Sequence, residues 1–140
     1  MRERLFTVSE ANALIPKLEI IMSQVQRHGL RLREEVADLA RSTGQEADNL
    51  TTAHILELRP HLRPVVEELE GLLAEIDACG GHMKGLDLGL VDFPAELEGQ
   101  VVLLCWQYGE KEIAYYHTLE AGFSGRMPLH RRVERPKYLQ

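Results

Sequence analysis

The spacing of the apolar residues changes at Gly80-Gly81, and this change constrains the fold more than any other feature of the chain. Before the two glycines, apolar residues recur every three or four positions along two long segments, which predicts helices. After them, the apolar residues fall in short runs of the kind that form strands. The chain is therefore expected to be an α+β protein, with a long antiparallel helical hairpin followed by a small antiparallel β-sheet of three to four strands.

The first helical segment opens with a capping box, because Thr7 and Glu10 can each accept a hydrogen bond from the other's backbone amide. Pro16 lies about two turns further on, so we expect the helix to bend or restart there. The helix is expected to end near residues 42–44. Its apolar positions have the spacing of a coiled-coil seam and are Leu14, Leu18, Ile21, Val25, Leu32, Val36 and Leu39.

The second helical segment carries a matching seam, with Thr51 or Thr52 as its N-terminal cap. Pro60 and Pro64 leave two alternatives: a kinked helix, or a regular helix that begins near Pro64 with proline in the first turn. The apolar positions are Ile55, Leu58, Leu62, Val65, Leu69, Leu72, Ile76 and Cys79. Two long seams joined by a short link predict that residues 6–80 form an antiparallel hairpin.

The predicted strands follow the glycines and span Leu88–Phe93, Val101–Tyr108 and Ile113–Leu119, with a short one possible at His82–Lys84. Pro94 is expected to end the first of them. Residues 109–112 are expected to form a tight turn, which would place Trp106 opposite Tyr115 and Leu104 opposite His117.

In that register, successive side chains alternate between two faces of the sheet. One face would carry Val102, Leu104, Trp106, Ile113, Tyr115, His117 and Leu119, and the other would carry Val101, Leu103, Cys105, Ala114 and Tyr116. Cys105 and His117 then point to opposite faces. A thiolate dyad of these two residues therefore requires a register shift of one residue.

Both predicted faces are apolar, and one helical hairpin can cover only one of them. The second face needs the C-terminal tail or another subunit, because a large exposed apolar patch usually marks an interface. We therefore expect a homodimer.

The length of 140 residues predicts a single domain, made of the hairpin (6–80), a β subdomain (82–128) and a basic tail (129–140). The net charge of −6 argues against nucleic-acid binding. The tail carries Arg131, Arg132, Arg135 and Lys137 and is interpreted first as solvated, with a partner-docking arm as the alternative. We see no signal peptide and no stretch of about 18 apolar residues that could cross a membrane, so a cytoplasmic protein is expected.

Several blocks of the chain resemble one prokaryotic family. They are Phe6-Thr7-x-x-Glu10-Ala11-Asn12-Ala13-Leu14-Ile15-Pro16, Gly89-Leu90-Val91-Asp92-Phe93-Pro94-Ala95, Leu104-Cys105-Trp106-x-x-Gly109-Glu110, Ile113-Ala114-Tyr115-Tyr116-His117 and Gly122-Phe123-x-Gly125-Arg126-x-Pro128. Together they look like the prokaryotic family called domain of unknown function 2203. Tyr116 stands where the family commonly has Trp, and Lys111 where it often has Pro. The resemblance implies a shared fold and brings no activity or cofactor.

The candidate site lies in residues 84–128 and consists of Asp92, Trp106, Glu110, His117 and Arg126. Asp92 and His117 on neighbouring strands can share a metal ion or a proton. The alternative is structural: Asp92 caps a turn and His117 bonds a backbone carbonyl. Likewise, the loop of residues 122–126 can present amides and Arg126 to an anion, or Arg126 can simply pair with a carboxylate.

No catalytic constellation is complete, so the sequence favours a non-enzymatic interaction or scaffold protein that forms homodimers. The alternative is a protein, with or without enzymatic activity, that binds a small ligand or a metal at a site in residues 84–128. Nucleic-acid binding through the basic tail is the least favoured hypothesis.

Overall fold

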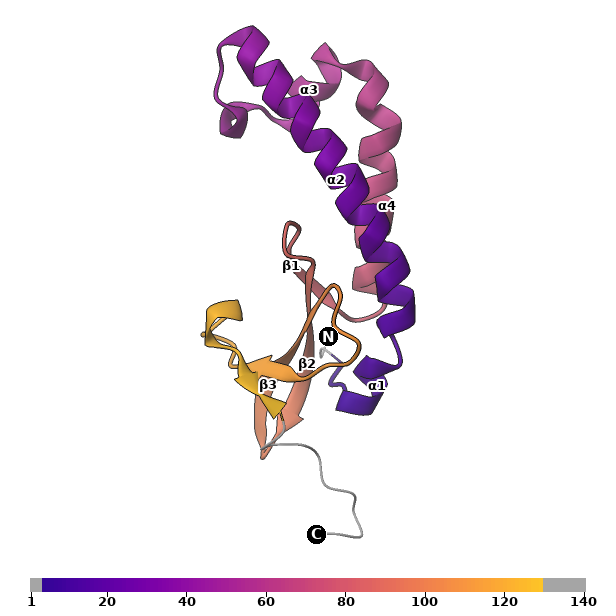
Figure 1. Cartoon of the computed structure of the whole chain (residues 1–140), viewed down its shortest axis with the longest axis vertical. Coiled ribbons are helices and arrows are strands. Elements are labelled where there is room, and N and C mark those ends of the chain that lie inside the picture. Colours follow the sequence, from indigo (N-terminus) through magenta and orange to yellow (C-terminus); the bar gives the residue numbers. More distant parts are fainter. Residues whose placement is uncertain (1–3, 130–140) are drawn as a thin grey trace.

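Two long helices extend away from a small sheet in the computed structural model, which describes residues 4–129 (Figure 1). The helices are α1 (Val8–Asn12), α2 (Ile15–Thr43), α3 (Thr52–Leu58) and α4 (Arg63–Ala78). The strands are β1 (His82–Gly85), β2 (Leu90–Leu97), β3 (Gln100–Gln107), β4 (Tyr115–His117) and β5 (Met127–Pro128). Short 3-10 turns lie at Ala47–Asn49, Pro60–Leu62 and Phe123–Gly125. The α+β prediction is confirmed.

The predicted capping box starts the helical part of the chain. The Thr7 hydroxyl accepts from the Glu10 amide at 3.0 Å, and the Glu10 carboxylate accepts from the Thr7 amide at 2.8 Å. The helix then restarts, because α1 ends at Asn12 and α2 begins at Ile15 with Pro16 in its first turn. Proline is tolerated there because the first amides of a helix have no intrahelical acceptor.

The second helical segment follows the second of the two alternatives. Thr51 caps α3, which ends before the turn at Pro60, and α4 then begins with Pro64 in its first turn. Arg59, which lies between α3 and the turn, connects this break to α2. Its guanidinium nitrogens donate to the carboxylates of Glu35 and Asp38 at 2.8 and 2.9 Å. From there α4 runs back beside α2 in the opposite direction (Figure 1).

The five strands form one antiparallel sheet in the order β1-β2-β3-β4-β5. The prediction that Pro94 ends a strand is wrong, because β2 continues through it to Leu97. The carbonyl of Pro94 accepts from the Phe6 amide at 2.7 Å. The nitrogen and carbonyl of one residue point to the same side of an antiparallel strand, so the proline nitrogen faces Phe6 and not β3. The missing N–H therefore costs no bond to β3.

The register of β3 and β4 also differs from the prediction. Leu103 lies opposite His117, Leu104 opposite Tyr116, and Cys105 opposite Tyr115. The tight turn is absent, and seven residues connect β3 to β4. The Glu110 side chain closes this connection by accepting from the Gln107 amide at 2.7 Å. The shift of one residue exchanges the faces of every side chain on β4.

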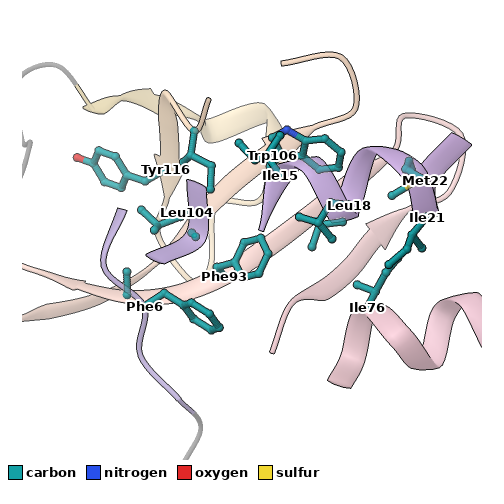
Figure 2. Close-up of a cluster of buried hydrophobic side chains, with 14 of the residues drawn as sticks. Phe6, Ile15, Leu18, Ile21, Met22, Ile76, Phe93, Leu104, Trp106 and Tyr116 are labelled. Atoms are coloured by element: carbon teal, nitrogen blue, oxygen red, sulfur yellow. The ribbon is translucent and has the colours of Figure 1, made fainter. Parts of the chain in front are cut away.

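The inner face of the sheet packs against the helices and forms the core (Figure 2). Phe6 meets the ring of Phe93 edge-on at 5.0 Å between centroids. Asn12 accepts from the Ile113 amide at 2.7 Å, so the loop before β4 is fixed to α1. The inner-face side chains that are buried are Val91, Phe93, Ala95, Leu97, Val102, Leu104, Trp106 and Tyr116. Because the inner face is filled in this way, a ligand site on the sheet has to lie on its outer face.

The turn between β1 and β2 docks against the middle of α2. Leu86 approaches Gly29 to 3.1 Å from the position that a Cβ atom would occupy, so a larger residue at Gly29 would crowd it. Gln26 donates to the Asp87 carbonyl at 3.2 Å, and Arg33 pairs with the Asp87 carboxylate. The beginning of β2 is thereby held in place relative to α2.

Candidate functional site

Three side chains with metal-binding atoms meet on the outer face of the sheet. Asp92 of β2 lies directly opposite Cys105 of β3. His117 of β4 lies opposite Leu103, two positions before Cys105, so it is the diagonal neighbour of the thiol. The prediction that Cys105 and His117 point to opposite faces is therefore wrong. Three adjacent strands each contribute one residue to the cluster.

The cluster is compact and deeply buried. One ligand atom from each of Asp92, Cys105 and His117 lies within 4.8 Å of the other two. The three residues are 1%, 1% and 3% exposed. Asp92 Oδ2 is 3.0 Å from His117 Nε2, whereas Asp92 Oδ1 is buried without a hydrogen-bond partner in the described part of the chain. A buried carboxylate oxygen without a hydrogen-bond partner is costly.

The hydrogen bond of His117 Nδ1 determines which ring nitrogen carries the proton. Nδ1 is 2.8 Å from the Thr118 carbonyl oxygen, which only accepts, so Nδ1 carries a hydrogen and donates it. In neutral imidazole, Nε2 then holds a lone pair that faces the Asp92 carboxylate. The two acceptors need a proton or a cation between them. Ligating histidines commonly have this arrangement, in which one nitrogen donates to a carbonyl and the other binds the metal.

The thiol of Cys105 is protonated when no cation is bound. Burial, together with the negative charge of Asp92, raises its pKa to about 12. Thiolate is the nucleophilic form of cysteine, so the corrected register alone does not make Cys105 and His117 a nucleophilic dyad. A divalent cation would stabilise the thiolate and remove this obstacle.

A cavity of about 290 Å³ lies over the cluster. Its lining includes all three cluster residues and is otherwise mainly apolar, with Lys84, Leu90, Leu103, Leu119, Gly122 and Phe123. A larger hollow of about 380 Å³ runs along α4, but residues 4–129 place no metal-binding trio in it. The cluster thus combines three metal-binding atoms with space for a ligand.

Glu110 and Arg126 pair with each other beside the cluster. Arg126 Nη2 donates to both Glu110 oxygens, at 3.0 and 2.8 Å, and approaches the Cys105 carbonyl at 3.4 Å. The guanidinium also stacks on Tyr115 and Phe123, at 4.2 and 4.9 Å from the ring centroids. Arg126 therefore holds Phe123 over the outer face, and its charge is matched by Glu110.

Trp106 lies on the opposite face from the cluster and is fully buried in the core (Figure 2). Its indole nitrogen donates to the Glu110 carbonyl at 2.9 Å, which supports the connection between β3 and β4. Of the five predicted site residues, the structure thus brings Asp92 and His117 together, places Glu110 and Arg126 beside them, and separates Trp106.

Cys105 is the residue that the sequence prediction missed. The assumed tight turn at residues 109–112 gave a register in which Cys105 and His117 lie on opposite faces of the sheet. One signal pointed to the other register: His117 is polar, and the inner face of a sheet covered by helices is a costly place for an unpaired imidazole.

The architecture is that of a small α+β protein: a pair of long helices, an antiparallel sheet and a polar cluster on the outer face of that sheet. Within residues 4–129, no helix has both the length and the hydropathy needed to cross a membrane.

This chain belongs to the family described as "Uncharacterized conserved protein (DUF2203)", whose model matches residues 4–129. The resemblance predicted from the sequence blocks is confirmed. No curated protein and no solved structure matches the chain.

Proposed function

We propose that this protein binds a divalent transition-metal ion, with Zn²⁺ as the best fit, through Asp92, Cys105 and His117. The observation that carries the proposal is the meeting of three buried ligand atoms, each within 4.8 Å of the others. Carboxylate oxygen, thiolate and imidazole are together the donor set of zinc, whereas Mg²⁺ and Ca²⁺ require oxygen ligands. Tetrahedral zinc with these ligands separates them by about 3.3–3.7 Å, so small side-chain movements suffice.

The groups around the cluster support this proposal. His117 donates its Nδ1 proton to the Thr118 carbonyl at 2.8 Å and so turns Nε2 toward Asp92 and the cavity. A cation there would satisfy Nε2 and provide a partner for Asp92 Oδ1. For this reason we rank metal binding ahead of the interaction protein that the sequence alone favours.

Three protein ligands leave one position of a tetrahedral ion open, which is typical of catalytic rather than structural zinc. Such an ion supplies Lewis acidity and lowers the pKa of bound water. The chain's own contribution is to hold the donors on three hydrogen-bonded strands and to exclude bulk water with apolar walls. The thiolate requires a reducing compartment, which agrees with the proposal of a cytoplasmic location.

The test is a titration of chelator-treated protein with Co²⁺ and Zn²⁺. We expect one ion per chain and a thiolate-to-cobalt charge-transfer band. Cys105→Ser should abolish the band and weaken binding by more than the roughly 10–100-fold that loss of an outer hydrogen-bond partner costs. Cys79→Ser is the matched control, because Cys79 is the other free cysteine and lies outside the cluster.

The proposal is overturned if the folded wild-type chain takes up no ion. It is also overturned if Cys105→Ser and His117→Ala bind the metal as tightly as Cys79→Ser does.

We propose, second, that the protein forms a homodimer through its long helices. Ile20 and Leu30 on α2 are 64% and 55% exposed, and Leu58 on α3 is 44% exposed. Native mass spectrometry should show a dimer for the wild type and a monomer for the variant that combines Ile20→Glu and Leu30→Glu. A wild-type monomer at micromolar concentration contradicts this second proposal and leaves the first untouched.

A further inference from the structure

The walls of the cavity over the cluster combine apolar side chains with one charged side chain. Leu90 and Leu103 form part of its floor and are buried, whereas Leu119 and Phe123 reach it from the segment between β4 and β5. Lys84 of β1 is the one Lys or Arg that lines the cavity among residues 4–129, and it is exposed. Its ammonium group pairs with no other residue of the described chain. The described part of the chain therefore gives the cavity hydrocarbon surface and a single free positive charge.

The charge of the metal-loaded cavity follows from its ionisable groups. A divalent cation with one carboxylate, one thiolate and one neutral imidazole is electrically neutral. Glu110 and Arg126 neutralise each other next to the cluster. Lys84 then leaves a net charge of +1 in the cavity, which a monoanion would balance.

The size of the cavity restricts the ligand further. Its volume of about 290 Å³ lies at the lower end of ligand pockets, which hold roughly 300–1,000 Å³. That is room for a small molecule and not for a nucleotide or a folded peptide segment. The aromatic wall is held in position, because Arg126 stacks on Phe123 and is itself paired to Glu110.

We infer that the site accepts a small carboxylate with an apolar body, an inference that rests on the proposed metal binding. The carboxylate fills the open position of the metal ion and balances the charge of Lys84. The hydrocarbon body lies against Leu90, Leu103, Leu119 and Phe123, the apolar lining of the cavity. Pockets of this type place a few polar groups among apolar walls so that orientation and affinity come from different parts of the ligand.

The experiment uses the full chain loaded with Co²⁺ and follows its absorption spectrum during titration with acetate, butyrate and hexanoate. We expect the affinity to rise by about fourfold for each added methylene until the cavity is filled. Hexanol and hexylamine have the same number of carbon atoms without the negative charge, and they should bind much more weakly than hexanoate.

Two variants separate the charge from the apolar wall. Lys84→Gln should weaken hexanoate binding by about two- to fivefold, as an exposed ion pair does, whereas Lys17→Gln on α2 should not change it. Leu119→Ser should flatten the dependence on chain length without unfolding the chain, because Leu119 is 62% exposed. Leu88→Ser is the matched control, since Leu88 is 49% exposed and does not line this cavity.

The outcomes distinguish the two proposals. If Co²⁺ binds stoichiometrically but the affinity is independent of chain length, or hexylamine binds as well as hexanoate, the carboxylate inference is overturned and metal binding stands. If no metal binds to the folded chain, both fall.

Discussion

The middle of the sheet is buried on both faces, but the two faces are chemically different. On the inner face, the polar atoms of the aromatic residues have partners: Trp106 donates to the Glu110 carbonyl, and the Tyr116 hydroxyl lies 3.8 Å from Met127 Sδ. On the outer face, Asp92 is 1% exposed, and Oδ1 has no partner in residues 4–129. Burial alone therefore does not distinguish core from site. The difference is that the outer face holds a buried carboxylate oxygen without a hydrogen-bond partner.

The largest effect is expected on the inner face. Trp106→Ala should lower the free energy of unfolding by about 3–5 kcal/mol, because it removes a fully buried ring and leaves a cavity. Denaturant unfolding measures the loss. A change below about 1 kcal/mol would contradict the assignment of Trp106 to the core.

On the outer face, a single substitution and a double substitution should have different effects on the free energy of unfolding. In metal-free protein, His117→Leu should destabilise the fold by about 3 kcal/mol, because it leaves the Asp92 charge buried and unpaired. Combining it with Asp92→Val should restore most of that loss while abolishing metal binding. Denaturant unfolding and Co²⁺ titration test the two parts. If the double variant is less stable than His117→Leu alone, the pair is structural and the contrast between the faces is lost.

The two cysteines should differ in reactivity by at least about a hundredfold. Alkylation requires the thiolate, and the pKa of Cys105 is raised to about 12, so its thiol stays protonated at pH 8. Cys79 is partly exposed and should react first. Iodoacetamide labelling of chelator-treated protein, read by peptide mass spectrometry, measures both rates. In denaturant the two rates should converge, and equal rates in the native protein would contradict the burial of Cys105.

The smallest effect is expected at the first helix. Thr7→Ala removes the side-chain acceptor of the capping box and should cost about 1 kcal/mol of stability. Metal affinity should not change, because α1 contacts the inner side of the sheet. A loss of metal binding in this variant would show that the two faces are not independent. Thr52→Ala serves as the control, since Thr52 is exposed inside α3 and Thr51 provides the cap there.

The helices were predictable because their signals are local. Thr7, Thr51 and Gly44 mark helix ends through bonds or backbone angles that involve only neighbouring residues, including the left-handed φ of 74° at Gly44. The break before Pro64 likewise follows from a missing amide within one turn. Such features are read from a few consecutive residues.

The sheet was less predictable because its geometry depends on residues far apart in the chain. Pro94 is accommodated within β2 because its nitrogen points away from β3, toward the distant Phe6 segment that bonds its carbonyl. The face on which Cys105 and His117 meet depends on a register shift of one residue, which the seven-residue connection and its closure by Glu110 set. The sequence therefore indicated two residues of the site, Asp92 and His117, but could not place the third beside them.

The bond between Asn12 and the Ile113 amide joins positions that are 101 residues apart. Ribosomes add about 5–20 residues per second, so these two groups are made roughly 5–20 s apart. Throughout that interval α1 lacks the strand connection that fixes it, whereas α2 and α4 are closer together in the chain. The first helix to be synthesised is thus among the last segments to reach its native contacts.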